Sequence, residues 1–204
     1  MIKNIIFDFG DIFINLDKQV IFREIETYGG NPKLGPEAYA INNQFEVGKI
    51  TNDEFISQLA TLYPKASAVK ITEIWNSMLL DFPDYRLNFI EKLADEAQYR
   101  LFLLSNTNAL HIPHVAKIMG SDKFNRFKSC FEQFYLSHEI QLRKPNADIF
   151  EYVLQQNRLK SQETFFIDDS KENTDAAQKM GITSWNLRVG KEDIIDLKSM
   201  LPHA

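Results

Sequence analysis

Ile5-Ile6-Phe7-Asp8-Phe9-Gly10-Asp11 is the stretch that decides the fold. Its first three residues are β-branched or aromatic with no polar alternation, which predicts a strand buried on both faces, as in a parallel sheet. Asp8 stands where that strand ends, and Gly10 can let the chain turn sharply there. Ligands of open α/β sheets bind outside the carboxyl ends of the strands. Asp8 is therefore either a functional carboxylate or the plain end of a strand at a turn, and this stretch alone leaves both open.

The composition is that of a soluble globular protein. The chain has 204 residues, of which 44% are hydrophobic and 25% charged, enough for a core of ordinary size. The net charge of −5 argues against a nucleic-acid partner. The one cysteine, Cys130, begins an apolar stretch and is expected in the core, and no internal disulfide is possible. We see neither a signal-like leader nor an apolar run of roughly 20 residues, so a cytoplasmic location and no membrane partner are expected.

The segment from 17 to 82 predicts helices and no strand. Apolar residues recur at helical spacing over 19–28 and 66–80, and Thr51-Asn52-Asp53-Glu54 has the form of a capping box that opens a further helix. Residues 31–36 are predicted to be a turn-rich link. We therefore expect an all-helical insertion, a cap, at 17–82, lying over the edge of the sheet.

Strands and helices alternate after this block. Such repeats imply a parallel sheet with helices on both faces, that is, a Rossmann-like α/β core made of residues 1–16 and 83–204. The expected strands are 100–104, 130–136, 164–167 and 182–187, and the expected helices are 85–98, 109–119, 146–156, 171–180 and 191–200.

Four loops leave the carboxyl ends of the predicted strands and carry complementary chemistry. The polar residues that follow the strands are Asp8, Ser105, Asn106, Lys144, Asp168 and Asp169. Clustered carboxylates resist ionising unless a cation lies among them, and hard oxygen ligands suit Mg²⁺. Hydroxyl, backbone N–H and ammonium groups bind phosphate. A carboxylate facing a neutralised phosphoryl group can attack it and form an aspartyl phosphate.

Each of these residues also has a plain structural explanation when taken alone. Lys144 precedes Pro145 and can be an exposed loop charge, Ser105 can cap the next helix, and Asp168 and Asp169 can cap the helix that starts near 171. Taken together, these residues indicate a site, because all of them fall at strand ends in one order.

The motifs in this order resemble the haloacid dehalogenase-like hydrolase superfamily, which is dominated by Mg²⁺-dependent phosphatases. The resemblance covers nearly the whole chain, and the stretch from Phe45 to Phe55 is similar to the cap of the subfamily whose helical cap lies between motifs one and two. The four motifs are matched by Ile5 to Asp11, by Leu103-Leu104-Ser105-Asn106, by Leu142-Arg143-Lys144-Pro145, and by Phe165 to Ser170 with Asn173 following.

The resemblance implies a role for each site residue. Asp8 would be the nucleophile and a metal ligand, together with the backbone carbonyl of Gly10. Asp169 would bind Mg²⁺ directly, and Asp168 would act directly or through water. Ser105 and Asn106 would hold the transferring phosphoryl group, and Lys144 would neutralise it and Asp8.

Position 10 departs from the family pattern. Most phosphatases of the family carry an Asp there that protonates the leaving group, and dehalogenating members carry Tyr, whereas this chain has Gly10. Asp11 is one residue further on, and a neighbour in a turn need not point the same way. General acid catalysis typically raises the rate by a factor of about 10² to 10⁴. Without an acid at position 10, we expect slow turnover, a substrate with an acidic leaving group, or an acid supplied by the cap.

The sequence thus predicts an Mg²⁺-dependent phosphatase of small phosphorylated, sugar-phosphate-like metabolites, acting as a monomer or homodimer. A catalytically silent binding or regulatory member is the alternative that Gly10 favours. A haloacid dehalogenase is a weaker one, because it needs no metal and leaves Asp168 and Asp169 unexplained. His111 and His114 lack a third clear ligand, so we expect surface or supporting residues rather than a zinc site.

Overall fold

The computed structural model describes residues 1–30 and 36–202, and its sheet has five strands. All neighbouring strands pair in parallel, in the order β3-β2-β1-β4-β5, so the predicted α/β fold with a parallel sheet is confirmed. The strands are β1 (Asn4–Phe7), β2 (Arg100–Ser105), β3 (Gln133–Leu136), β4 (Thr164–Asp168) and β5 (Thr183–Asn186).

The first strand lies at the centre of this sheet, and all of its residues are buried. Phe7 is in register with Leu103 of β2 on one side and with Ile167 of β4 on the other. The residues that follow, Asp8 and Asp168, therefore leave the sheet at the same level. The register alone brings two of the predicted site carboxylates to one edge.

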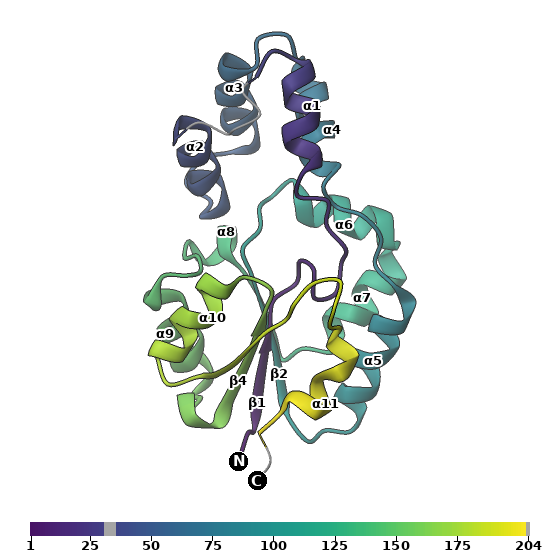
Figure 1. Ribbon diagram of the computed structural model, residues 1–204, viewed down its shortest axis with the longest axis vertical. Coiled ribbons are helices and arrows are strands. Elements are labelled where there is room, and N and C mark those ends of the chain that lie inside the picture. Colours follow the sequence, from purple (N-terminus) through teal and green to yellow (C-terminus); the bar gives the residue numbers. More distant parts are fainter. Residues whose placement is uncertain (31–35, 203–204) are drawn as a thin grey trace.

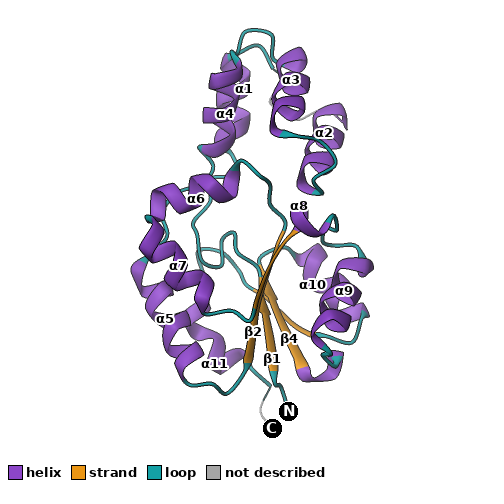
Figure 2. Ribbon diagram, turned by 180° about the vertical axis from the view of Figure 1, so that it is seen from behind, coloured by secondary structure: helices purple, strands orange, loops and turns teal. Residues whose placement is uncertain are grey.

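Helices cover both faces of the sheet (Figures 1 and 2). Side chains of a strand alternate between faces, so Ile5 and Phe7 pack in one core with residues of α5, α6, α7 and α11, while Ile6 packs in another with α9 and α10. The helices are α5 (Asp84–Asp95), α6 (His111–Met119), α7 (Ser121–Ser129) and α11 (Leu197–Met200) on one face, and α9 (Ala147–Asn157) and α10 (Lys171–Lys179) on the other.

Between β1 and α5, the described residues form four helices that stand over the carboxyl edge of the sheet (Figure 1). They share a separate core that includes Phe55 stacked on Phe45. The predicted capping box is present, since Thr51 Oγ1 accepts from Glu54 N at 3.3 Å and Glu54 Oε2 accepts from Thr51 N at 2.7 Å. The helices are α1 (Val20–Thr27), α2 (Pro36–Glu46), α3 (Asn52–Leu62) and α4 (Ala68–Asn76).

The cap boundaries at 17 and 82 remain a prediction. The turn-rich link predicted at 31–36 lies outside the described residues except for Pro36, which opens α2. No helix in the described ranges has the length and apolarity needed to cross a membrane.

Several elements differ from the sequence-based expectation, and one of them is α8 (Ser137–Ile140), where no helix was predicted. Helix α7 was not predicted, and its C-cap is Cys130, so β3 begins at Gln133 rather than at 130. Cys130 is only partly buried instead of belonging to the core. The helix expected at 191–200 is reduced to a 3-10 turn (Ile194–Asp196) and α11, because Asp193 caps the chain there and starts the turn late.

Candidate active site

Lys144 is the centre of the polar network at the carboxyl edge of the sheet. Its Nζ donates to Asp8 Oδ1 at 2.7 Å, to Asp168 Oδ2 at 2.7 Å and to the carbonyl oxygen of Leu104 at 2.8 Å. An ammonium group has three donors, so all of them are used by the protein. Lys144 and Asp168 are 1% and 0% exposed. A charge this deeply buried needs such partners, which excludes the reading of Lys144 as an exposed loop charge.

The charges in this network influence one another. Burial alone would lower the pKa of Lys144, but Asp168 and Asp8 outweigh burial and raise it, so the ammonium stays protonated. Burial raises the pKa of Asp8 to about 7; Lys144 opposes this, and Asp168 and Asp169 add to it. One ammonium shared by two carboxylates does not fully neutralise both. The network therefore has room for a further positive charge.

Ser105 and Asn106 follow β2 and lie in the same place, but their side chains do different things. Asn106 Nδ2 donates to the backbone oxygen of Lys144 at 2.8 Å, and its Oδ1 accepts from Lys144 N at 2.9 Å. The Asn106 side chain thus positions the Lys144 backbone. The predicted contact of Asn106 with a phosphoryl group stays a prediction, and the group left to make it is the backbone N–H of Asn106. Ser105 Oγ has only a weak 3.5 Å contact with the Asn106 carbonyl, which leaves its hydroxyl free to turn toward a ligand.

Three carboxylates form a cluster that fits a hard divalent cation. Asp8, Asp168 and Asp169 offer oxygen atoms that all lie within 4.8 Å of one another. Mg²⁺ prefers such oxygen ligands and keeps several waters. Asp168 is already occupied, since it accepts from Lys144, from Ser170 N at 2.8 Å and from Asn173 Nδ2 at 3.0 Å. Asp168 thus holds Lys144 in place, and the direct binding of Mg²⁺ by Asp169 stays a prediction.

Lys18 also reaches this edge, and sequence reasoning missed it. Its Nζ lies 2.6 Å from Asp169 Oδ2 and 2.8 Å from Asp11 Oδ2. Partial burial alone would lower the pKa of Lys18, but hydrogen bonds to Asp11 and Asp169 outweigh it and raise the pKa. A lone lysine in a linker has no spacing pattern, so only the folded structure reveals its place.

Asp11 rather than Gly10 has the unusual backbone in the first loop. The φ of Asp11 is 57°, in the left-handed region, whereas Gly10 has no positive φ, which corrects the expected reason for the glycine. Asp11 Oδ1 accepts from Leu16 N at 3.1 Å and its Oδ2 pairs with Lys18. Both oxygens are thus used to fix the loop. Asp11 is not placed as a free proton donor.

A cavity of about 220 Å³ lies between the cap helices and this edge of the sheet. Drug-sized ligands fill pockets of about 300–1,000 Å³, so this cavity suits a smaller molecule. Both apolar side chains and hydrogen-bonding groups line it. The apolar part of the lining includes Gly10, Leu16, Ile21, Met78 and Leu79, and the polar part includes Asn42, Glu46, Ser105, Asn106, Thr107 and Asn108.

The cap contacts the core through two polar links beside this cavity. Glu46 Oε2 accepts from Arg143 Nε at 3.1 Å and from Nη2 at 2.9 Å, next to Lys144. His111 Nε2 donates to the backbone oxygen of Trp75 at 3.1 Å. Burial lowers the pKa of His111 to about 4, so it is neutral at pH 7. His111 is buried, which excludes the surface position and leaves the supporting role among the two alternatives expected for it.

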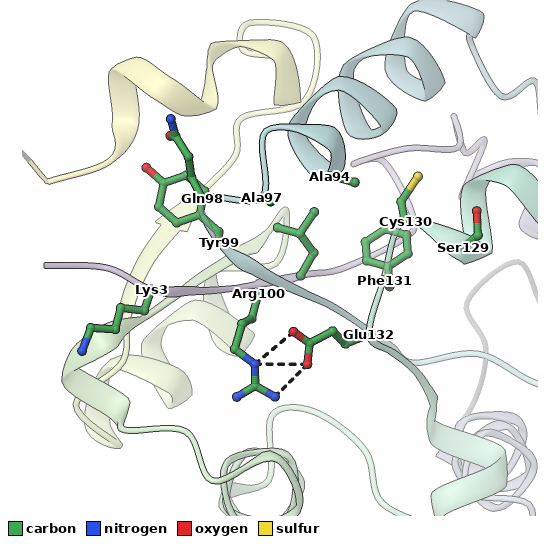
Figure 3. Close-up of a pocket in the computed structure, with 11 residues that line it drawn as sticks. Lys3, Ala94, Ala97, Gln98, Tyr99, Arg100, Ser129, Cys130, Phe131 and Glu132 are labelled. Atoms are coloured by element: carbon green, nitrogen blue, oxygen red, sulfur yellow. Dashed lines mark hydrogen bonds and ion pairs between the residues drawn. The ribbon is translucent and has the colours of Figure 1, made fainter.

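A larger hollow of about 640 Å³ lies at the start of β2, and it carries no comparable chemistry (Figure 3). Arg100 in it is paired with Glu132 at 2.7 Å. Burial raises the pKa of Cys130 to about 11, so its thiol is protonated and a poor nucleophile at pH 7. The candidate active site is therefore the polar network around Lys144 together with the adjoining cavity, which Gly10, Ser105 and Asn106 line.

The comparison with family models decides the relationship. The model described as haloacid dehalogenase-like hydrolase matches residues 5–187, which include β1 except Asn4, the cap helices α1 to α4, and β5. The chain belongs to this family. The resemblance seen in the motifs is confirmed, and the protein is an enzyme of the haloacid dehalogenase-like hydrolases.

Relatives within this family include phosphatases. A D-ribitol-5-phosphate phosphatase of Bacteroides thetaiotaomicron is 25% identical over 197 residues, covering 94% of this chain and 95% of the relative. A sesquiterpene phosphatase of Aspergillus oryzae is 25% identical over 204 residues, covering 98% of this chain and 96% of the relative. A solved HAD family enzyme from B. thetaiotaomicron, in complex with magnesium, is 34% identical with a TM-score of 0.82, covering 93% of this chain and 95% of that chain. These relatives support phosphatase activity.

Proposed function

We propose that this protein is an Mg²⁺-dependent phosphatase of small phosphomonoesters, with Asp8 as its nucleophile. The observation that carries the proposal is the position of Asp8 at the end of the central strand, between the Lys144 ammonium and the acidic cluster with Asp169. The phosphatase relatives and the magnesium complex of the solved HAD enzyme support it.

The chemistry follows from what these groups can do. A carboxylate oxygen of Asp8 attacks phosphorus, the bond from phosphorus to the ester oxygen breaks, and the alcohol leaves with a proton from solvent or the cavity wall. Water then attacks the aspartyl phosphate, which releases inorganic phosphate and restores Asp8. Lys144 keeps the Asp8 carboxylate oriented, and Ser105 offers its hydroxyl to the phosphoryl oxygens. Mg²⁺, held by Asp8, Asp169 and the Gly10 carbonyl, would neutralise charge on the phosphoryl group.

We further propose that the alcohol portion of the substrate is short, uncharged and hydroxylated. Glu46 is one of the polar residues that line the cavity, and its Oε1 accepts from Asn42 Nδ2 at 3.2 Å and has capacity left to accept from a hydroxyl. The Glu46 charge is already compensated by Arg143, so the wall needs no cationic substrate. The name of the relative that acts on D-ribitol 5-phosphate agrees with a polyol of this kind.

Release of inorganic phosphate from a matched panel tests this proposal. With Mg²⁺ present, kcat/KM for a five-carbon polyol 5-phosphate should exceed that for n-pentyl phosphate by a factor on the order of 10² or more, because unpaired polar groups in the wall reject the alkyl chain. Glu46→Gln should reduce this ratio by about tenfold, since hydrogen bonds to charged groups are the stronger ones.

Glu37→Gln is the matched control, because Glu37 is exposed on the same helix α2. It should leave the ratio unchanged. Equal rates for both substrates would contradict the polyol assignment but not the phosphatase. No release from any phosphate, with or without Mg²⁺, would favour a binding member of the family instead.

A second prediction concerns the acid that position 10 lacks. A Cβ added at Gly10 would lie 2.8 Å from Leu16 Cδ1 at the cavity wall, so an Asp there points at the substrate only if Leu16 moves. The wild type has no acid at position 10 to protonate the leaving group. Aryl phosphates, whose leaving groups depart without a proton, should therefore react faster than alkyl phosphates in the wild type. Gly10→Asp combined with Leu16→Ala should flatten the dependence of kcat on leaving-group pKa, relative to Leu16→Ala alone.

Asp11→Asn separates the remaining possibilities for that proton. Because both Asp11 oxygens are bound within the protein, the slope against leaving-group pKa should be the same in Asp11→Asn as in the wild type. A flat wild-type dependence that becomes steep in Asp11→Asn would show that Asp11 supplies the proton.

A further inference from the structure

Lys18 lies in the connection between the first loop and cap helix α1. This connection is anchored on both sides, since Asp17 N donates to the Met78 carbonyl at 2.9 Å and Val20 N donates to the Asp17 carbonyl at 3.2 Å. The side chain of Lys18 points the other way, to the acidic edge of the sheet, where it ends between Asp11 and Asp169. One residue thus joins the start of the cap to the candidate metal ligands.

The pairing differs from the surface ion pairs of the molecule. The side chains of Asp11 and Asp169 are 9% and 15% exposed, and Lys18 is 49% exposed. By contrast, Lys171 and Asp175 on α10 are 76% and 45% exposed. Surface pairs of the latter kind contribute little, whereas a cation facing two mostly buried carboxylates interacts strongly with both.

The charges at this edge are balanced for one more divalent cation. Four carboxylates gather there, and two ammonium groups are paired with them, Lys144 with Asp8 and Asp168, and Lys18 with Asp11 and Asp169. The formal balance is −2. Lys144 is buried with all its donors used. The Lys18 ammonium is therefore the group that an incoming ion can displace.

We propose that Lys18 is a built-in competitor of the metal ion for Asp169. In the metal-free protein its ammonium neutralises Asp169 and Asp11, and on metal binding it gives up Asp169 and keeps Asp11. The inference rests on the proposed Mg²⁺ site. It makes Lys18 a positioning residue that links metal occupancy to the first connection of the cap, because that connection loses one of its two charged anchors when the metal binds.

Mg²⁺ titration of the intact protein tests this, measured by calorimetry and by the rise in melting temperature. Lys18→Met removes the charge and keeps the length, so the Kd for Mg²⁺ should fall by about tenfold at low salt. The gain should shrink at high ionic strength, since Lys18 is half exposed. Lys18→Arg keeps the charge and should stay within about twofold of the wild type.

Lys171→Met is the matched control, because it removes an equally positive side chain near Asp169 in the sequence but paired with Asp175. Its Kd should match that of the wild type. Without metal, Lys18→Met should melt below the wild type. The difference should narrow at saturating Mg²⁺, where only the pair of Lys18 with Asp11 still distinguishes the two proteins.

Two results would overturn the inference in distinguishable ways. If the wild type binds Mg²⁺ and Lys18→Met binds it equally or more weakly, Lys18 is no competitor and the proposed function is untouched. If the wild type shows neither heat of binding nor a melting shift with Mg²⁺, the metal part of the proposed function fails, and this inference fails with it.

Discussion

Asp8→Asn is expected to lower kcat by on the order of 10³ or more while the protein stays folded. The amide keeps the shape of the side chain, but it is no nucleophile, and removing a group that forms the covalent intermediate costs more than removing a helper. Steady-state phosphate release with the preferred substrate measures the loss. Asp148→Asn, an exposed acid in the first turn of α9, is the control and should keep wild-type activity.

The same variant has an expected signature in stability. Burial raises the pKa of Asp8 to about 7, so folding favours its protonated form. Such a group contributes stability at low pH and loses it as pH rises from its unfolded value near 4 through 7. In metal-free protein, the melting temperature of Asp8→Asn should therefore rise relative to that of the wild type as the pH increases from 5 to 8. More than a tenth of wild-type activity in a normally folded Asp8→Asn protein would refute the nucleophile assignment.

The strands and their terminal acids were predictable because both signals are local. Ile5 to Phe7 and Leu101 to Leu104 are unbroken apolar runs, and runs of this kind are buried on both faces of a parallel sheet. A polar residue directly after such a run must lie at the carboxyl edge. The convergence of Asp8 with Asp168 then follows from register, without any knowledge of the loops.

Helix α7 escaped prediction because its apolar signal is weak. Ser121–Ser129 is mostly charged and polar, and Phe124 and Phe127 alone face the core. Tertiary packing stabilises this helix instead, since Phe127 contacts the rings of Phe13 and Phe82 from distant parts of the chain. Tertiary contacts of this kind overrule local preference and leave no pattern in the sequence.

The side-chain assignments of the site were harder to predict than its location. The predicted contact of Asn106 with a phosphoryl group stays a prediction. Its side-chain amide was not expected to bind the backbone N–H and carbonyl of Lys144, a contact that depends on how two loops approach. Lys18 was missed for the same reason, because its partners lie on other segments. A motif indicates which residues meet, but hydrogen-bond geometry decides which groups remain for a ligand.

Lys144→Met is expected to destabilise the folded protein by about 3–5 kcal/mol, the usual cost of removing one partner from a buried ion pair. Met has a similar length, so the change removes mainly the charge and leaves Asp8 and Asp168 without their shared cation. Chemical denaturation measures the loss. Lys160→Met, on an exposed side chain 3.9 Å from Glu163, should cost little.

The pH dependence of this loss tests the electrostatic cause. Lys144 lowers the pKa of Asp8, so its removal raises that pKa further and makes the charged form of Asp8 harder to keep in the folded state. The variant should lose more stability than the wild type as pH rises from 5 to 8, and should approach the wild type at acidic pH, where the carboxyl takes up a proton. Added Mg²⁺ should recover part of the deficit at pH 8, because a divalent cation at Asp8 and Asp169 supplies the missing positive charge. A loss that is equal at pH 5 and pH 8, and unchanged by Mg²⁺, would mean that the lysine stem contributes by packing and that its charge does not hold the site together.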